Sequence, residues 1–281
     1  MPISAIEVKY MCLGDPNCKC NMISDIRALR DQEILFGKRA LCAVEDDEKV
    51  AAARAEYAQN PTFDNLMELG IALAFQMRYH EAIECFEGAI ELNPDNYQAR
   101  RKCAGRYLST LQLDKAEEAF LWCDERGEDR LDTRYMLGCI AYYKFEYEKA
   151  LALFEECFAL AENNDDMYVA ALFWAIACSV QLGYDLDGVL AKYKDMQIGH
   201  HTGYLQAVRL FMGDDLRDCD NIPKEDKLQN CIFMYGVHLY YLYRKNAMLA
   251  DIALKNTLAN DTYFSAFAYL GAYTEYLKNN N

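Results

Sequence analysis

The stretch from His80 to Pro94, HEAIECFEGAIELNP, gathers residue types that bind metals and transfer protons. It begins His80-Glu81-x-x-Glu84, close to the HExxH motif whose two histidines, one helical turn apart, hold zinc in metalloproteases. Here Glu84 stands in place of the second histidine. The motif is therefore incomplete, and its meaning depends on the element that carries it.

Three cysteines near the N-terminus, Cys12, Cys18 and Cys20, form a second candidate site. Zinc ligand pairs usually have about two to four residues between them, a spacing that these cysteines do not share. A fourth ligand would have to be Cys42 or a more distant residue. Free thiols in a reducing compartment are the favoured interpretation, and metal binding or redox chemistry is the alternative.

Other sequence signatures of enzymes are missing. GxGxxG, GxxxxGK[ST], GxSxG and CxxC are all absent from the sequence. His200-His201 falls in a predicted loop, with no carboxylate or cysteine at ligand spacing nearby. We therefore expect neither an enzyme nor a cofactor.

The charge of the chain limits its partners. The formal net charge is −15, from 29 basic and 44 acidic side chains, and most of the excess lies between residues 61 and 182. Because an acidic surface repels phosphate backbones, nucleic-acid binding is not expected.

The N-terminal sequence and the apolar stretches predict the compartment. Met1-Pro2-Ile3-Ser4 lacks the basic start and apolar run of a signal peptide. The most apolar stretch, Tyr168–Val180, is shorter than the roughly 20 residues that span a membrane. Twelve cysteines without a secretory signal suggest reduced thiols. We expect a cytoplasmic protein with no membrane partner.

An internal period of 34 residues indicates which elements carry these side chains. Three segments align without gaps at this spacing. Their shared positions hold small residues or aromatics: Leu69-Gly70, Cys103-Ala104 and Leu137-Gly138; Ala82, Ala116 and Ala150; Phe86, Phe120 and Phe154; Ala89, Cys123 and Cys157. Small residues let antiparallel helices approach closely, and the aromatic fills the gap between pairs. Since one pair cannot bury its apolar face alone, the period predicts stacked helix pairs.

This pattern resembles the tetratricopeptide repeat. Residues 62–95 hold residues typical of the family at its signature positions: Leu66, Leu69-Gly70, Leu73, Ala82, Phe86, Ala89 and Pro94. The next two units match less fully, because Arg100 and Arg134 stand where the family prefers a large apolar residue. The resemblance implies an all-α fold, a right-handed superhelical solenoid of antiparallel helix pairs.

The chain is expected to have three parts. These are an N-terminal cysteine-containing segment (1–23), tetratricopeptide-like repeats (24–197, clearest in 62–163) and degenerate C-terminal helical repeats (198–281). The first part includes Ala5–Tyr10, which alternates like a short strand. Residues 30–62 are expected to form a degenerate repeat, with Phe36-Gly37, Ala40, Ala53 and Pro61 in corresponding places. The last part is expected to hold loops at 199–203 and 214–226 and helices at 228–243, 247–258 and 262–277.

The repeat changes the meaning of His80-Glu81-x-x-Glu84. His80 and Glu84 fall at positions that vary between units, with the counterparts Asp114 and Glu148 for His80, and Glu118 and Ala152 for Glu84. Turns and helix surfaces exposed to solvent tolerate such variety. No catalytic or metal-binding role is expected for them.

A binding site is expected on the concave face instead. In the resembling family the first helix of each pair lines the inside of the superhelix, which implies these partner-binding residues here: Asp64, Met67, Ile71, Phe75, Gln98, Arg101, Lys102, Leu108, Tyr135, Tyr142, Tyr143, Tyr240 and Tyr241. Tyr240 and Tyr241 are expected to correspond to Tyr142 and Tyr143. Tyrosine is common at recognition surfaces, although packing between helices is the alternative role.

One helix also carries a dense basic patch. Arg100, Arg101, Lys102 and Arg106 lie close together in an otherwise acidic region, where an arginine could bind a peptide carboxylate bidentately. Ion pairs with neighbouring acidic residues such as Asp132 are the alternative. Family members that bind chaperone C-termini use a lysine and asparagine clamp, and its asparagine positions here hold Ile71, Gly105 and Cys139. That specific activity is not expected.

The sequence thus predicts a non-enzymatic module that binds a protein or peptide partner in its concave groove. One alternative is a regulator that responds to a signalling peptide and acts through another protein. Another is a metal or redox protein that uses Cys12, Cys18 and Cys20. Homo-oligomerisation is left open, because the apolar ends of a solenoid can pair.

Overall fold

The computed structural model describes residues 29–41, 44–216, 222–223 and 225–280, and within these ranges the regular secondary structure is entirely helical. The predicted all-α class is confirmed. The chain divides into two compact units. One is Gly37–Ile140, and the other, called the C-terminal unit below, combines Met1–Phe36 with Ala141–Asn281. The boundary falls inside α8 (Arg130–Tyr143).

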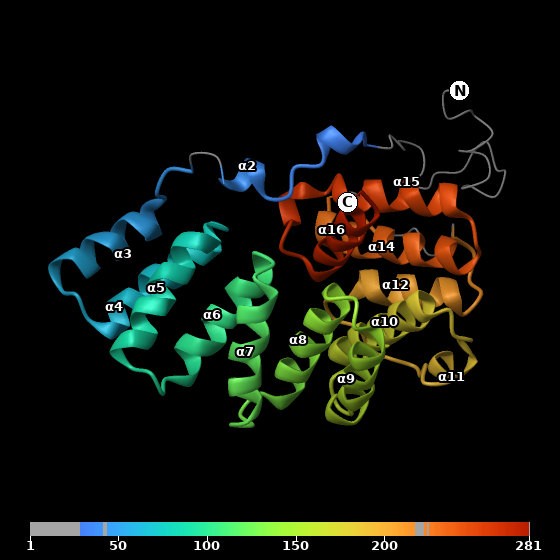
Figure 1. The fold of residues 1–281 in the computed structure, drawn as a ribbon, viewed down its shortest axis with the longest axis horizontal. Helices are drawn as coiled ribbons and strands as arrows, with labels where there is room; N and C mark the ends of the chain where they lie inside the picture. The colour runs from blue at the N-terminus through green and yellow to red at the C-terminus, as the bar shows by residue number, and fades with distance from the viewer. Residues whose placement is uncertain (1–28, 42–43, 217–221, 224, 281) are drawn as a thin grey trace. The chain divides into compact units, whose positions relative to one another are not determined.

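The 37–140 unit is a row of helices in which each packs on the next. Figure 1 shows this row, and contacts join α3 to α4, α4 to α5, α5 to α6 and α6 to α7. Its helices are α2 (Lys38–Leu41), α3 (Glu48–Gln59), α4 (Phe63–Phe75), α5 (Tyr79–Leu92), α6 (Tyr97–Ser109), α7 (Leu113–Asp124) and the first part of α8.

The C-terminal unit is also built from packed helices, and α14 packs against α10, α12, α15 and α16. Its elements are η1 (Asp31–Glu33), the end of α8, α9 (Tyr147–Leu160), α10 (Asp165–Leu182), α11 (Asp187–Leu190), α12 (Thr202–Phe211), α14 (Lys227–Tyr243), α15 (Ala247–Leu258), η2 (Asp261–Tyr263) and α16 (Phe267–Asn280). The helices expected at 228–243 and 247–258 are confirmed. Thr202 already begins α12, and α16 begins later than expected because a short 3-10 turn precedes it.

The turns inside the helix pairs repeat one backbone geometry. After α4, the Met77 N–H donates to the Ala74 carbonyl at 3.0 Å, and the Arg78 N–H donates to the Leu73 carbonyl at 3.0 Å. These two bonds form a Schellman motif around a residue with positive φ. Equivalent bonds and positive φ recur at Leu111, Phe145, Gly183, Gly213 and Lys245. The same turn therefore occurs in the clear repeats and in the degenerate ones.

The turn geometry also corrects the register of the last pair. Tyr240–Tyr241 lies five and four positions before the turn residue Lys245, whereas Tyr142–Tyr143 lies three and two positions before Phe145. The correspondence expected between these tyrosines is therefore wrong by two residues. Gly236 lies nine positions before Lys245, whereas Gly138 lies seven before Phe145, so the glycine and the turn cannot both align.

Lys245 offers a test of this turn geometry. Its φ is 56°, in the region where a Cβ atom clashes with the backbone, and its side chain is exposed. We expect Lys245→Gly to raise the free energy of unfolding by about 1 kcal/mol, because glycine lacks this clash. Urea unfolding measures the change. Arg244→Gly is the control: its φ is −76°, so glycine there should only destabilise the helix end. Equal effects of the two changes would contradict the prediction.

The repeated small and aromatic residues form the core of the 37–140 unit as expected. Ala82, Ala116, Phe86 and Phe120 are at most 1% exposed. A Cβ atom at Gly70 would lie 2.7 Å from Cε1 of Phe86, which explains why α4 has a glycine where it crosses α5. With Phe86 buried between them, α4 and α5 can approach this closely only if position 70 has no side chain.

The core of the C-terminal unit is built around α10. Residues 168–178 of this helix are buried on every side, as expected for a helix surrounded by others. Trp174 is completely buried, and its ring contacts those of Phe154, Phe173, Tyr142, Tyr143 and Tyr235. No helix in the described ranges has both the length and the apolar character required to cross a membrane.

The segment before α2 packs on the last helix of the C-terminal unit. Phe36 stacks on Tyr273 of α16, with ring centroids 4.4 Å apart. Asp31 pairs with Lys255, and its carbonyl accepts a hydrogen bond from Tyr276 at 3.4 Å. Phe36 thus packs against α16 in this unit. The strand expected at 5–10 and the cysteines Cys12, Cys18, Cys20 and Cys42 lie outside the described residues.

Candidate functional site: a basic groove on α4 and α6

The first helices of two successive pairs form a groove. The side chain of Thr62 caps α4 through the Asn65 N–H at 3.3 Å, and that of Asn96 caps α6 through the Ala99 N–H at 2.9 Å. Both helices present residues spaced three or four apart on one face. Their facing sides enclose a hollow of about 300 Å³, lined by Ile71, Ala74 and Phe75 of α4, Phe86 of α5, and Arg101, Lys102, Gly105 and Arg106 of α6.

One side of this groove is apolar and open. Phe75, the last residue of α4, is 80% exposed. Together with Ile71, Ala74 and Phe86 it forms the apolar part of the lining, and ligand-binding pockets are lined mainly by apolar side chains. An added Cβ at Gly105 would meet only Arg101 Nη1, at 3.6 Å, so the absence of a side chain keeps this side of the groove accessible.

The other side of the groove is basic. Arg101 forms an ion pair with Asp132 and lies over the ring of Phe120, 5.1 Å from its centroid. The ion-pair alternative considered for the basic patch therefore holds for Arg101. Its Nη2 is paired with Asp132, and the side chain forms part of the groove wall.

Arg106 and Lys102 differ from Arg101. Within the part of the chain that the structure describes, neither forms an ion pair with a carboxylate. The Arg106 guanidinium lies over the ring of Tyr79, 4.6 Å from its centroid, and desolvation lowers its pKa from the ordinary value. A partly desolvated guanidinium without a counter-ion gains most from a ligand carboxylate.

The remaining residues expected on α4, α6 and α8 do not line this groove. Asp64 and Gln98 are exposed on their helices, away from the hollow's lining. Met67, Leu108 and Tyr135 are 7%, 1% and 3% exposed and belong to the core. Side chains at these positions face the next helix and have little surface for a partner.

Tyr142 and Tyr143 are buried as well. They are 1% and 2% exposed. The Tyr143 hydroxyl donates to the Phe267 carbonyl at 2.9 Å, and the Tyr142 hydroxyl joins a hydrogen-bond network described below. Packing between helices, the alternative considered from the sequence, describes both residues in this structure. The tyrosine content indicated a large aromatic surface but could not show which side of the helix it covers.

Tyr240 and Tyr241 line a different hollow, within the C-terminal unit. It measures about 550 Å³ and includes Leu210, Asp214, Arg244 and Leu249. Tyr240 packs edge-on against Phe211, with ring centroids 5.8 Å apart, and Tyr241 is 9% exposed. These two residues thus lie apart from the groove on α4 and α6.

Two groove features were not expected from the sequence. Phe86 was identified as a packing residue, and it also forms part of the groove lining. The ring of Tyr79 lies against one face of the Arg106 guanidinium. The spacing of Tyr79 and Arg106 carries no signal for this contact, because it depends on how α5 crosses α6.

The His80–Pro94 stretch forms α5, and its acidic start is part of an ion-pair network. Glu81 pairs with Arg78 at 2.7 Å and with Arg54 at 3.4 Å, and both arginines also pair with Asp46. Hydrogen bonds from Arg54 and Arg78 lower the pKa of Asp46 to about 2. His80 is exposed. In the described ranges no three His, Cys, Asp or Glu side chains are grouped to hold a metal.

His200 and His201 are held by hydrogen bonds to Asp166. Their backbone N–H groups donate to Asp166 Oδ1 at 2.9 and 2.8 Å. These hydrogen bonds lower the pKa of Asp166, despite desolvation, which acts in the opposite direction. The His201 Nδ1 lies 2.7 Å from the Asp166 carbonyl. The carboxylate missing near these histidines in sequence is thus supplied by α10, where it anchors the start of α12.

A family model supports the repeat assignment in two segments. A family model described as tetratricopeptide repeat matches residues 64–96 and 131–164. Among solved structures, a similar chain is YrrB, described as a TPR protein with an unusual peptide-binding site. It has 16% sequence identity, the match covers 82% of this chain and 99% of that chain, and the TM-score is 0.44. No curated protein matches the chain significantly.

The matched segments coincide with the helix pairs that share the 34-residue period. Residues 64–96 correspond to α4 and α5, and residues 131–164 correspond to α8 and α9. The same Schellman turn joins the helices of both pairs, at Met77 and at Phe145. Residues 64–96 and 131–164 are therefore tetratricopeptide repeats.

Proposed function

We propose that this chain is a non-enzymatic protein-interaction module that binds an acidic peptide segment of a partner in the groove on α4 and α6. One observation carries the proposal. Lys102 and Arg106 line the groove without an ion-pair partner among the described residues, beside a phenylalanine that is 80% exposed. A partner segment with a carboxylate next to an apolar side chain complements both the basic side and the apolar side of the groove.

Each groove residue has a distinct part in this proposal. Arg106 binds the carboxylate bidentately, since Tyr79 holds its guanidinium plane from one side. Lys102 adds a second positive charge. Phe75 and Ile71 contact the apolar side chain of the ligand, and Gly105 leaves room for its backbone. Arg101, already paired with Asp132, maintains the wall.

Peptide binding tests the proposal directly. The probe is a pool of short fluorescein-labelled peptides rich in Asp and Glu, each with one Phe or Leu, titrated with the full chain by fluorescence anisotropy. Arg106→Gln is expected to weaken binding about tenfold, because a hydrogen bond to a charged group contributes about 1.5–3 kcal/mol. Phe75→Ala is expected to weaken it too, with little effect on folding because the side chain is mostly exposed.

Arg130→Gln is the matched control. Arg130 is exposed at the start of α8 and outside the groove lining, so its replacement removes the same charge without touching the site. It should leave the affinity unchanged. Failure of every acidic peptide to bind the wild-type chain would reject the proposal. So would equal affinities of wild type, Arg106→Gln and Phe75→Ala.

The proposal keeps the expectations on location and partners. The cytoplasm remains the proposed compartment, supported by the twelve cysteines of the sequence. The partner is a protein or peptide, and no nucleic acid, membrane or cofactor is part of the proposal. Homo-oligomerisation stays open, to be measured by light scattering.

A further inference from the structure

A buried polar network in the C-terminal unit is unconnected with the groove. Glu275 of α16 is 5% exposed. Its Oε1 accepts hydrogen bonds from the hydroxyls of Tyr142, at 3.0 Å, and of Tyr235. Its Oε2 lies 2.9 Å from Nε2 of His238 on α14. The network thus connects α8, α14 and α16, and burying such groups is costly unless all are satisfied.

The hydrogen bonds around His238 and Glu275 limit where the protons of these two side chains can lie. His238 Nδ1 lies 2.8 Å from the Ala250 carbonyl, which can only accept, so Nδ1 carries a hydrogen. The contact between His238 Nε2 and Glu275 Oε2 then needs one further proton. The Tyr142 and Tyr235 hydroxyls lie 2.8 Å from each other and both contact Glu275 Oε1, so at least one of them donates to the carboxylate, which favours its ionised form. With that proton on Nε2, the pair is an imidazolium and a carboxylate that together bury no net charge.

His238 stands where the clear repeats have a small residue. Counted back seven positions from the turn residue, Gly70, Ala104, Gly138 and His238 are equivalent. Ala250, whose carbonyl binds His238, is equivalent to Ala82 by the same count. In the clear repeats a small side chain allows the two helices of a pair to touch. In the last pair the imidazole bridges them and continues to the following helix.

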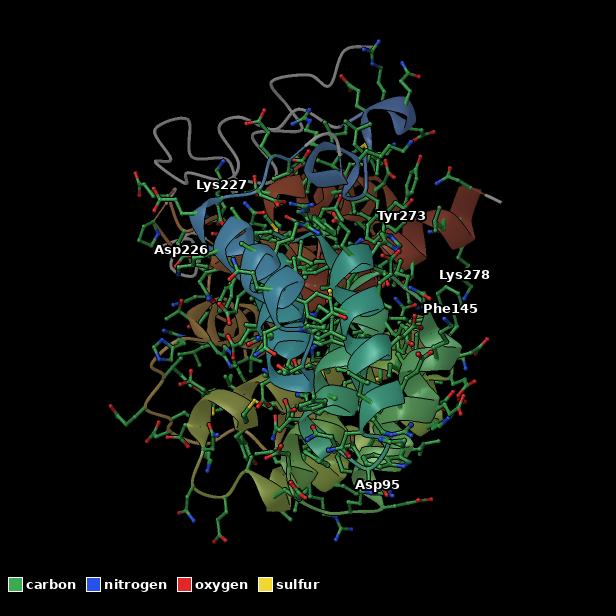
Figure 2. All side chains as sticks on the ribbon, turned by 90° about the vertical axis from the view of Figure 1, so that its left-hand side faces the viewer. Asp95, Phe145, Asp226, Lys227, Tyr273 and Lys278 are labelled. Carbon is green, nitrogen blue, oxygen red and sulfur yellow. The ribbon has the colours of Figure 1, made fainter. Side chains whose placement is uncertain are left out.

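The other contacts of α16 involve segments distant in sequence. Phe36 stacks on Tyr273, and Lys278 lies over the ring of Phe145, 4.3 Å from its centroid. Figure 2 labels Tyr273, Phe145 and Lys278, which belong to this junction. A change in how α16 sits on α14 would therefore also reach the segment that ends at Phe36.

We propose that His238 and Glu275 form an acid-sensitive lock, in which protonation of Glu275 releases α16 and the docked Asp31–Phe36 segment from α14. Protonated Glu275 would leave the imidazolium buried without a counter-ion, and an unpaired buried charge is strongly destabilising. The other titratable groups near Glu275 are Tyr142, Tyr235, Tyr147 and Cys178, none of which supplies negative charge in acid. Burial raises the pKa of all four.

The direction of the pH effect follows from Glu275. Desolvation alone would raise its pKa, but His238 and the two tyrosines outweigh it and lower the pKa below 4.5. A carboxylate with a lowered pKa contributes stability above its unfolded value, and that stability is lost as the pH falls through the folded value. Release is therefore an acid effect that begins near pH 4.5 and grows below it.

Hydrogen exchange of the full chain tests the lock. Peptides from 267–280 and 29–36 are compared at pH 7 and at about pH 4, after correction for intrinsic exchange rates. In the wild type, protection of these peptides is expected to fall by up to about fourfold in acid, the limit for one carboxylate with an unfolded pKa of 4.5, and further than protection of α4 and α5. In Glu275→Gln, whose amide can donate to a neutral His238, this difference should largely disappear. Glu91→Gln, at an exposed position, should behave as wild type.

Two results would overturn the lock: unchanged α16 protection in the wild type, or the same acid effect in Glu275→Gln. A measurement on a chain with this pair intact covers the case in which Glu275→Gln does not fold. The sequence has four histidines, so His80→Gln/His200→Gln/His201→Gln leaves His238 as the only one. Its ¹⁵N shifts at pH 7 should show hydrogen on both ring nitrogens, and a neutral ring would contradict the proposal.

Discussion

Replacing Trp174 with alanine is expected to lower the free energy of unfolding of the C-terminal unit by about 4 kcal/mol, within the range for large aromatic residues in cores. Trp174 is completely buried at the centre of α10. Its ring lies 4.9 Å from that of Tyr142 and 5.4 Å from that of Phe173, measured between centroids. Alanine would remove these contacts and leave a cavity. The surrounding helices are held by their other contacts and cannot move in to fill it.

The two tryptophans of the sequence make this prediction measurable unit by unit. Trp122 lies in the 37–140 unit and is partly exposed, so Trp122→Ala should cost much less. In Trp174→Ala, the remaining fluorescence reports on the 37–140 unit, while circular dichroism reports on all helices. Urea unfolding should show an early loss of helix that precedes the Trp122 transition. Similar losses of stability in both variants would contradict the central role of Trp174.

Replacing Gly236 with alanine is expected to lower the free energy of unfolding by about 2 kcal/mol, since added volume in a packed core typically costs 1–3 kcal/mol. A Cβ atom at Gly236 would lie 2.3 Å from Cβ and 3.3 Å from Cα of Ala207, on the facing helix α12. The helices would have to separate to accommodate one methyl group.

A double-mutant cycle tests whether this contact is the cause. Ala207→Gly alone should cost up to about 1 kcal/mol through helix propensity, and combined with Gly236→Ala it should recover part of the loss. Gly188→Ala is the control for the glycine change itself, because an added Cβ there meets nothing within 4 Å. Strict additivity of the two changes would show that the clash is not the source of the effect.

The repeat could be predicted from the sequence because its signal is local. Ala82 and Phe86, and their counterparts at intervals of 34 residues, lie on the same helix faces whatever the partner. Their burial in the structure follows from that spacing. Ile71, Phe75, Arg101 and Lys102 were expected on one face through the family resemblance, and all four line the same hollow; that a partner binds there stays a prediction.

The state of each side chain in the groove depended on contacts between helices. Arg101 and Arg106 have the same chemistry, yet Arg101 is paired by Asp132 of α8, while Arg106 stacks on Tyr79 and has no counter-ion among the described residues. Tyr142 and Tyr143 are buried because α10, α14 and α16 surround them, and no residue near them in sequence indicates this.

The sequence by itself determined the helix pairs and their period, because capping, small residues and apolar spacing act within a few turns of one chain segment. The tertiary structure alone decided the division into two compact units, the docking of Phe36 on α16 and the pairing of His238 with Glu275. These contacts join residues far apart in the chain. Their energies depend on which buried polar groups find partners across helices, which no local pattern encodes.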